Sequence, residues 1–185
     1  MASRPDFEAQ RSITPLPVLL TVDTVSDSIM KLDGKKALVF GVASEDSIAY
    51  AICQRLAQAG CSLILGFQPR FRSRIQQLVA TLPEGTELHP IDVNVEGSTA
   101  SFFESWQANS PGAKADIIVH AIGFAPREAF DRNLLFVDME PMDVALRISA
   151  HSLQGIVRHA LPHLAPNSST ITLTYAASTR HVPSY

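Results

Sequence analysis

The sequence predicts an α/β fold in which helices cover both faces of a parallel sheet. Three observations support this prediction. From Leu32 onward, short apolar runs alternate with segments whose apolar residues recur at helical spacing. No repeat and no internal linker interrupts the alternation. Parallel neighbours need a crossover connection, and such crossovers are right-handed, so this order specifies a sheet with a helical layer on each side.

The composition is that of one globular domain. The chain has 185 residues, of which 46% are hydrophobic and 18% charged, and this is enough apolar material to bury a core. A formal net charge of −3 provides no basic surface for nucleic acid. No stretch approaches the roughly 18–20 apolar residues of a membrane span. We therefore expect neither nucleic acid nor a membrane as a partner.

The cysteines and the first thirty residues indicate a cytoplasmic protein. Cys53 and Cys61 form no CxxC pair and no zinc-type spacing with histidine, so we expect two buried free thiols and no metal. Residues 1–30 combine acidic residues with proline, serine and threonine, which is typical of a flexible extension rather than of a secretory signal or transit peptide. The folded domain is expected at residues 31–185.

Three strands are predicted in the first half of the domain. Residues 36–40 form an apolar run that ends at Gly41, the pattern of a strand buried on both faces. Residues 61–67 form a second such run, and residues 88–93 predict a third strand. Two helices lie between these strands, and the first ends near Gly60. The apolar stripes of the two helices are Ile48, Ile52, Leu56 and Ala59, then Ile75, Leu78 and Val79.

Two further strands are predicted in the second half. A helix marked by Phe102, Phe103 and Trp106 precedes a strand at 116–121. Pro141 suits the first turn of a long helix, which leads to a fifth strand at residues 170–175. The apolar stripe of the long helix is Val144, Ile148, Ile156, Val157, Ala160 and Leu164.

Ligands of parallel sheets bind just beyond the carboxyl ends of the strands. The segment after the first predicted strand lacks the GxGxxG dinucleotide motif, but Gly41 permits close backbone approach and Ser47 opens the next helix. A hydroxyl and free N–H groups at a helix start can hold a pyrophosphate. The alternative, which this segment alone favours, makes Gly41 a turn residue and Ser47 a helix cap.

The second and third strand ends carry polar side chains. Gln68 could hydrogen-bond a ribose or adenine, although the usual acidic residue for a ribose is missing. Arg70, Arg72 and Arg74 could receive a 2′-phosphate, and they equally suit a solvated helical face. Asp92 could accept a hydrogen bond from an adenine amine or cap the next helix.

The last two strand ends carry a histidine and a tyrosine. His120 is predicted to be a core or edge histidine rather than a base, and Gly123 provides a small, flexible backbone where a cofactor ribose would pass. Tyr175 ends the fifth predicted strand, and Tyr185 is the last residue of the sequence. A phenol can stabilise a developing oxyanion. The structural alternatives are a core aromatic for Tyr175 and a frayed terminus for Tyr185.

Taken together, these segments resemble the nicotinamide-dependent enoyl-(acyl-carrier-protein) reductases of bacterial-type (type II) fatty acid synthesis. This family is a divergent branch of the short-chain dehydrogenases/reductases. The resemblance runs in the family's order from Leu32 to the end of the chain. The matching stretches are 34–36 through 41–44, 47–50, 92–93, 119–125, 148–149, 173–175 and 182–185.

The resemblance implies a Rossmann-like fold with strand order 3-2-1-4-5 and a binding site for NADH, with NADPH left open. Gly41, Ser47 and Ile48 would hold the pyrophosphate, and Gln68 would lie beside the adenosine. The remaining coenzyme residues would be Asp92 and Val93 at adenine, Gly123 at a ribose and Ile148 at the nicotinamide.

The resemblance also implies a reaction and its partners. Hydride passes from the nicotinamide to a trans-2-enoyl thioester on acyl carrier protein, and the second of two tyrosines holds the enolate oxygen. That tyrosine maps to Tyr185, and the first, a substrate-side residue, maps to Tyr175. Members of the family form homo-oligomers.

The sequence departs from the family in ways that predict a C-terminally truncated, partial domain. The family places a lysine seven residues beyond the second tyrosine, and here Tyr185 is the last residue. The last strands and helices of the family are missing as well. Arg147, His151 and Thr179 replace the family's Asp, Tyr and Glu. Two alternatives stay open: a non-catalytic nucleotide-binding or assembly module, and another short-chain reductase acting on a 3-oxoacyl or ketone group.

Overall fold

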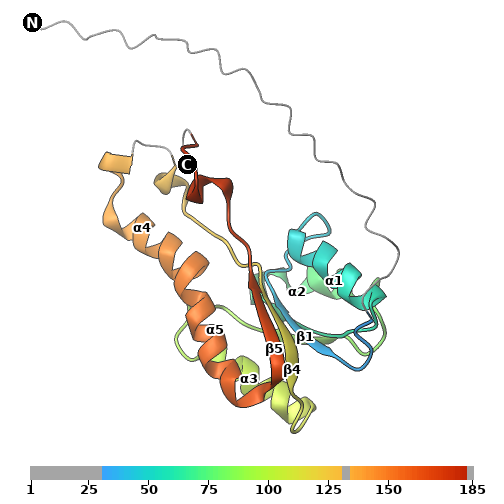
Figure 1. Ribbon diagram of the computed structural model, residues 1–185. Coiled ribbons are helices and arrows are strands. Elements are labelled where there is room, and N and C mark those ends of the chain that lie inside the picture. The colour runs from blue at the N-terminus through green and yellow to red at the C-terminus, as the bar shows by residue number, and fades with distance from the viewer. Residues whose placement is uncertain (1–30, 131–133, 183–185) are drawn as a thin grey trace, which may run out of the picture.

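The computed structural model describes residues 31–130 and 134–182 (Figure 1). Within these ranges the chain folds into a five-stranded, all-parallel sheet with strand order β3-β2-β1-β4-β5. This confirms the predicted fold class and strand order. The predicted extension at residues 1–30 lies outside the described residues. The strands are β1 Lys36–Phe40, β2 Ser62–Phe67, β3 Glu87–Pro90, β4 Ala115–His120 and β5 Leu164–Thr172.

Helices lie on both faces of the sheet. Figure 1 shows α1 and α2 on one side and α3 and α5 on the other. Residues 37–40 of β1 alternate between the two resulting cores and are fully buried, as expected for a central parallel strand. The helices are α1 Ile48–Gln58, α2 Arg72–Val79, α3 Ser98–Asn109, α4 Met139–Leu146 and α5 Ser152–Ala160.

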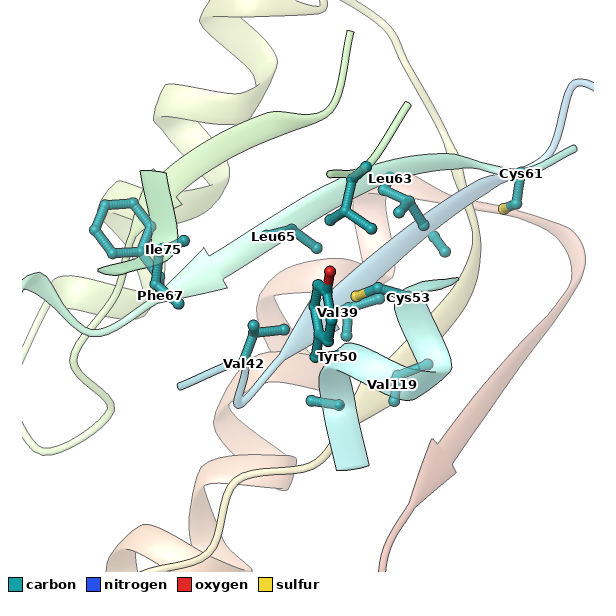
Figure 2. Close-up of a cluster of buried hydrophobic side chains, with 13 residues drawn as sticks. Val39, Val42, Tyr50, Cys53, Cys61, Leu63, Leu65, Phe67, Ile75 and Val119 are labelled. Atoms are coloured by element: carbon teal, nitrogen blue, oxygen red, sulfur yellow. The ribbon is translucent and has the colours of Figure 1, made fainter. Parts of the chain in front are cut away.

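The core between the sheet and the first helical pair is drawn in Figure 2. Tyr50 and Cys53 of α1 and Ile75 of α2 pack there against side chains of β1 and β2. On the opposite face, Phe102 of α3 packs against Phe40 of β1, with ring centroids 4.9 Å apart. Each helical layer therefore packs apolar side chains on the sheet, although Ile48 of the predicted α1 stripe is 65% exposed. The carboxyl ends of the parallel strands share one edge.

Two of the predicted strands differ from the structure. The third strand ends at Pro90 instead of Val93, although the Ile91 N–H still donates to the Phe67 carbonyl. The fifth strand begins at Leu164, six residues before its predicted start, because Pro162 ends the preceding helix in a short 3-10 turn at residues 161–163. Leu164 therefore belongs to β5 and not to the helical stripe.

The predicted long helix is interrupted. A π-helical turn at Arg147–His151 separates α4 from α5. Ile156 and Ala160 of α5 are fully buried, as the stripe predicts, whereas no described residue of α4 is buried. Only the α5 half of the predicted helix therefore packs as a core element.

Strand β5 is an edge strand with exposed apolar side chains, and this predicts self-association. Ile171 is 50% exposed on a strand that, within residues 31–130 and 134–182, pairs with β4 alone. Unpaired edges of this kind template strand pairing between molecules, and a charge on the edge suppresses it. We expect the chain to associate as its concentration rises, and Ile171→Lys to weaken that association in light scattering. Leu161→Lys is the control, because Leu161 is 63% exposed but lies outside the strand. Equal association of both variants would contradict the prediction.

The two cysteines are buried and free, as predicted. Burial raises the pKa of the Cys53 thiol to about 12. Burial, reinforced by the charge of Asp116, raises the pKa of Cys61 to about 11. The Cys61 thiol also donates to the Lys35 carbonyl at 3.2 Å. Both thiols are therefore protonated and shielded in the folded chain.

We expect neither thiol to react appreciably with an aqueous disulfide reagent at mildly alkaline pH while the chain is folded, and both to react once it is denatured. Because the folded pKa values exceed the ordinary value of about 9, the neutral thiols stabilise the fold below that pH. The free energy of unfolding should fall as the pH rises above it. The reaction is measured by the absorbance of the thiol that the reagent releases. Rapid reaction of the folded chain would contradict the prediction that both thiols are shielded.

Candidate functional site

A cavity of about 400 Å³ lies at the carboxyl edge of the sheet. Its walls come from the segments that follow β1, β2, β3 and β4, closed on one side by α4 and the π turn. This is the place where open parallel sheets bind ligands. Six of the residues singled out from the sequence line this cavity together: Gly41, Gln68, Asp92, Val93, Gly123 and Ile148.

Gly41 directly follows β1 and lies beside Ala121, which directly follows β4. Its φ is +106°, and a Cβ atom at this position would lie 2.2 Å from the carbonyl oxygen of Ala121. The Ala121 N–H donates to the Phe40 carbonyl at 3.0 Å, which holds the two segments together. Glycine is therefore required here both by its backbone conformation and by the neighbouring strand.

Ser47 and Ile48 are not among the residues that line the cavity. The Ser47 hydroxyl accepts from the Tyr50 N–H at 3.3 Å and donates to the Ser44 carbonyl at 2.7 Å. Ser47 is thus the N-cap of α1, as the structural alternative expected. Ile48 begins α1 and is 65% exposed. A pyrophosphate-binding role for these two residues stays a prediction.

The ends of β2 and β3 are joined by side chains. Gln68 Nε2 donates to Asp92 Oδ2 at 3.1 Å, and Asp92 Oδ1 accepts from the Asn94 N–H at 3.0 Å. The Asp92 carboxylate closes a turn and does not cap α3, whose N-cap is Gly97. Each carboxylate oxygen has a second lone pair, so Asp92 can still accept a hydrogen bond from a ligand.

The three arginines after β2 differ in position. Arg70 lines the cavity, and its guanidinium lies 4.7 Å from the centre of the Phe71 ring. Arg72 and Arg74 lie over aromatic rings as well, at 5.4 Å from Phe67 and 5.9 Å from Phe71. Only Arg70 of the three is therefore placed to meet a ligand in the cavity.

The segment after β4 is tied to the π turn. The Phe124 N–H donates to Ser149 Oγ at 3.0 Å, and that hydroxyl donates to the Phe124 carbonyl at 2.9 Å. Arg147 Nε donates to Asn94 Oδ1 at 2.9 Å, which connects the same turn to the segment after β3. These bonds join three walls of the cavity.

His120 is the core histidine that the sequence predicted. It is the last residue of β4, is 1% exposed, and bonds Thr172 and Ser152. Burial lowers its pKa and favours the neutral ring. It does not line the cavity, so it is not placed to act as a base on a ligand there.

Of the two predicted tyrosines, the structure describes only Tyr175. Tyr175 follows β5, is 51% exposed and does not line the cavity. Tyr185 lies outside the described residues. The roles of both stay predictions.

Several cavity residues were not singled out as site residues from the sequence. Asn94, Phe124 and Val144 all line the cavity. Asn94 follows Asp92 by two residues at a strand end, and that position was an available signal. No sequence signal marked Val144 as a site residue, because only the tertiary fold brings its helix α4 to the carboxyl edge of the sheet.

Metal-ligand clusters and membrane-spanning helices are both absent from the described residues. Residues 31–130 and 134–182 contain no cluster of three side chains suited to a metal ion. No helix in these ranges is both long and apolar enough to cross a membrane.

Comparison with known proteins identifies relatives. A family model described as enoyl-(acyl carrier protein) reductase matches residues 41–185. The NADH-type enoyl-(acyl-carrier-protein) reductase FabI of Synechocystis is 32% identical over 162 residues, and that of Salmonella typhimurium is 34% identical over 156. These matches cover 85% and 83% of the chain. They span only 61% and 58% of the relatives' length.

Solved structures agree. The Bacillus cereus enoyl-acyl carrier protein reductase, solved with NADP+ and an indole naphthyridinone, superposes with a TM-score of 0.79 at 29% identity. An enzyme of the same kind from Anaplasma phagocytophilum, solved with NAD, gives 0.77 at 26% identity. The matches cover 83% and 85% of this chain but 60% and 58% of those structures. Sequence and structure together show that this chain belongs to the enoyl-(acyl carrier protein) reductase family.

Proposed function

We propose that this chain binds NAD(H) in the cavity and forms the coenzyme-binding part of a reductase for trans-2-enoyl thioesters carried by acyl carrier protein. One observation supports this most directly. Six of the eight residues that the resemblance assigns to the coenzyme line a single cavity, and only Ser47 and Ile48 do not. The substrate, a homo-oligomeric state and a cytoplasmic location are part of the proposal, because the chain spans about 60% of its relatives.

The side chains present suit a dinucleotide. Asp92 has acceptor capacity for an adenine amine, and Ile91 and Val93 offer apolar surface beside it. Gln68 retains its amide oxygen as an acceptor for a ribose hydroxyl, because only its Nε2 is engaged by Asp92. Gly123 has open space where a Cβ would stand, so a ligand can approach its backbone.

The coenzyme, when bound, would supply a hydride to the β-carbon of the enoyl thioester and would itself be oxidised to NAD(P)+. The α-carbon of the resulting enolate would take a proton from water. Gly123, in the segment after β4, and Ile148, in the π turn, would both contact the nicotinamide end of the coenzyme and orient it. Tyr185 would donate a hydrogen bond to the thioester oxygen as negative charge develops on it. Tyr175 would lie on the substrate side.

NADH and NADPH differ by the 2′-phosphate, and Arg70 is the cavity residue that could meet it. Gln68 favours the free ribose hydroxyls of NADH. We therefore propose NADH as the coenzyme and keep NADPH as the alternative. Arg70→Ala should weaken NADPH binding more than NADH binding if the phosphate reaches this wall.

The test is to titrate the 185-residue chain with NADH, follow the coenzyme fluorescence, and then add a crotonyl thioester. We expect weak saturable binding and little or no loss of NADH absorbance. The lysines of this 185-residue chain are Lys31, Lys35, Lys36 and Lys114, and all of them precede Tyr185 in the sequence. Loss of one oxyanion-stabilising group costs about 10²–10³ in rate. Turnover near that of a complete reductase would contradict the expected low activity, and absence of binding would contradict the coenzyme proposal.

A second candidate function is a nucleotide-binding module without catalysis. The exposed position of Tyr175 away from the cavity favours it. Extending the chain with the relatives' Tyr-x6-Lys helix and the strands beyond distinguishes the two. If the chain is part of a reductase, the extension should restore reduction of the crotonyl thioester. If it is a non-catalytic module, the extended chain should still bind NADH without turnover.

Gly41 supports a stability prediction for the same edge. Gly41→Ala would strain the backbone by about 1–3 kcal/mol. Overlap with the Ala121 carbonyl would add about 1–3 kcal/mol. We expect a matching loss in the free energy of unfolding, measured by urea titration of the chain without coenzyme.

The matched control is Gly123→Ala, because a Cβ at Gly123 meets nothing within 4 Å. Its unfolding midpoint should stay close to that of the parent chain, while its NADH affinity should fall if the coenzyme runs past this backbone. Similar unfolding midpoints for the two variants would contradict the prediction that the contact between Gly41 and Ala121 excludes a larger side chain at position 41.

A further inference from the structure

A buried side-chain relay lies behind the cavity wall that Ile148 forms. His120, at the end of β4, is 1% exposed, and Ser152, at the start of α5, is 7% exposed. His120 Nε2 lies 2.8 Å from Ser152 Oγ, which lies 2.6 Å from the carbonyl oxygen of Ile148. The relay therefore connects the central sheet to a cavity residue.

The direction of the relay follows from its last acceptor. A carbonyl oxygen only accepts, so the Ser152 hydroxyl donates to Ile148 and must itself accept from His120. His120 Nε2 is therefore the protonated nitrogen of a neutral ring. Its Nδ1 accepts from the Thr172 hydroxyl at 3.2 Å, which ties β5 into the same relay.

In a regular α-helix the Ile148 carbonyl would accept from the Ser152 backbone N–H, but here it accepts from the Ser152 hydroxyl. The Ser152 N–H points to the carbonyls of Arg147 and Ala150 instead of that of Ile148, four residues back. The hydroxyl bonds the Ile148 carbonyl in its place. Isolated π turns within helices occur frequently at functional sites. Here the turn carries Ile148 into the cavity wall.

The same turn is fastened on its outer side. Ser149 Oγ bonds both the N–H and the carbonyl of Phe124, next to Gly123. The turn is thus held between the segment after β4 on one side and the buried end of β4 on the other. A shift at Ser152 would reach both Ile148 and the backbone around Gly123.

We infer that His120 and Ser152 are positioning residues, which hold the π turn so that Ile148 and the segment after β4 form a binding-competent wall for the coenzyme. Neither side chain lines the cavity, so both act through Ile148. The inference rests on the proposed function, because the cavity is taken as the NADH site.

The test measures the NADH dissociation constant of the 185-residue chain and its variants. Ser152→Ala and His120→Asn remove the relay, since the shorter asparagine amide does not reach Ser152. Each should weaken binding about five- to tenfold, the effect of one buried hydrogen bond. His120→Gln places an amide nitrogen near the original Nε2 position, and Ser152→Thr keeps the hydroxyl, so both should stay within about threefold of the parent. Equal losses in the disrupting and conservative variants would overturn the inference.

The chain offers a matched control in a second histidine–serine pair. His89 of β3 is 1% exposed, and its Nδ1 lies 2.9 Å from Ser105 Oγ of α3. Neither residue lines the cavity. Ser105→Ala should lower the thermal unfolding temperature much as Ser152→Ala does, yet leave NADH binding unchanged. A comparable loss of NADH binding in Ser105→Ala would show a general stability effect and overturn the positioning role.

Amide hydrogen exchange without coenzyme separates this inference from the proposed function. Ser152→Ala should accelerate exchange at residues 122–124 and 148–152, and Ser105→Ala should not. If the parent chain binds no NADH, the proposed function fails, while exchange still decides whether the relay holds the wall. Unchanged exchange in Ser152→Ala overturns the relay even if NADH binds.

Discussion

The close approach of β1 and β4 is the constraint on which the cavity depends. At the end of these strands only the hydrogen atoms of Gly41 separate its backbone from the Ala121 carbonyl. Beyond this point the chain after β1 runs to α1 on one face of the sheet, and the chain after β4 runs toward α4 and α5, the latter on the other face. Two neighbouring strands that continue to opposite faces leave a crevice between their connections. A wider side chain at Gly41 would separate the strands and alter the floor of that crevice.

The walls of the crevice are held by bonds between segments that are distant in sequence. Gln68 joins Asp92, Arg147 joins Asn94, and Ser149 joins Phe124. Each bond links two different connections of the sheet. A ligand entering the cavity therefore meets polar groups that are already oriented, which reduces the ordering cost of binding. Arg147 has a structural role here, because its guanidinium reaches across to the segment after β3.

The parts of the fold that could be predicted from sequence are those whose signal is local. Strands β1, β2 and β4 are continuous apolar runs, and their observed bounds agree with the predicted ones within one residue. The middle of strand β5 is polar and largely exposed, so apolar patterning located only its last three residues, 170–172, and placed its end at 175 instead of Thr172. The π turn has no residue signature, since it arises from tertiary bonds such as that of Ser152. Gln68 and Asp92 were found because they lie just beyond the ends of β2 and β3, whereas Val144 comes to the cavity only through packing of a helix.

The π turn also constrains how the chain can change in length. Residues advance by about 100° around an α-helix, so a wide turn shifts the rotational phase of α4 relative to α5. Deleting one residue between Arg147 and His151 would favour a continuous α-helix while α5 stays anchored by Ile156 and Ala160. Val144 would then rotate off the cavity, and the partner of Asn94 would be displaced with it. Insertions and deletions should therefore be far less tolerated in this five-residue stretch than substitutions on its exposed side.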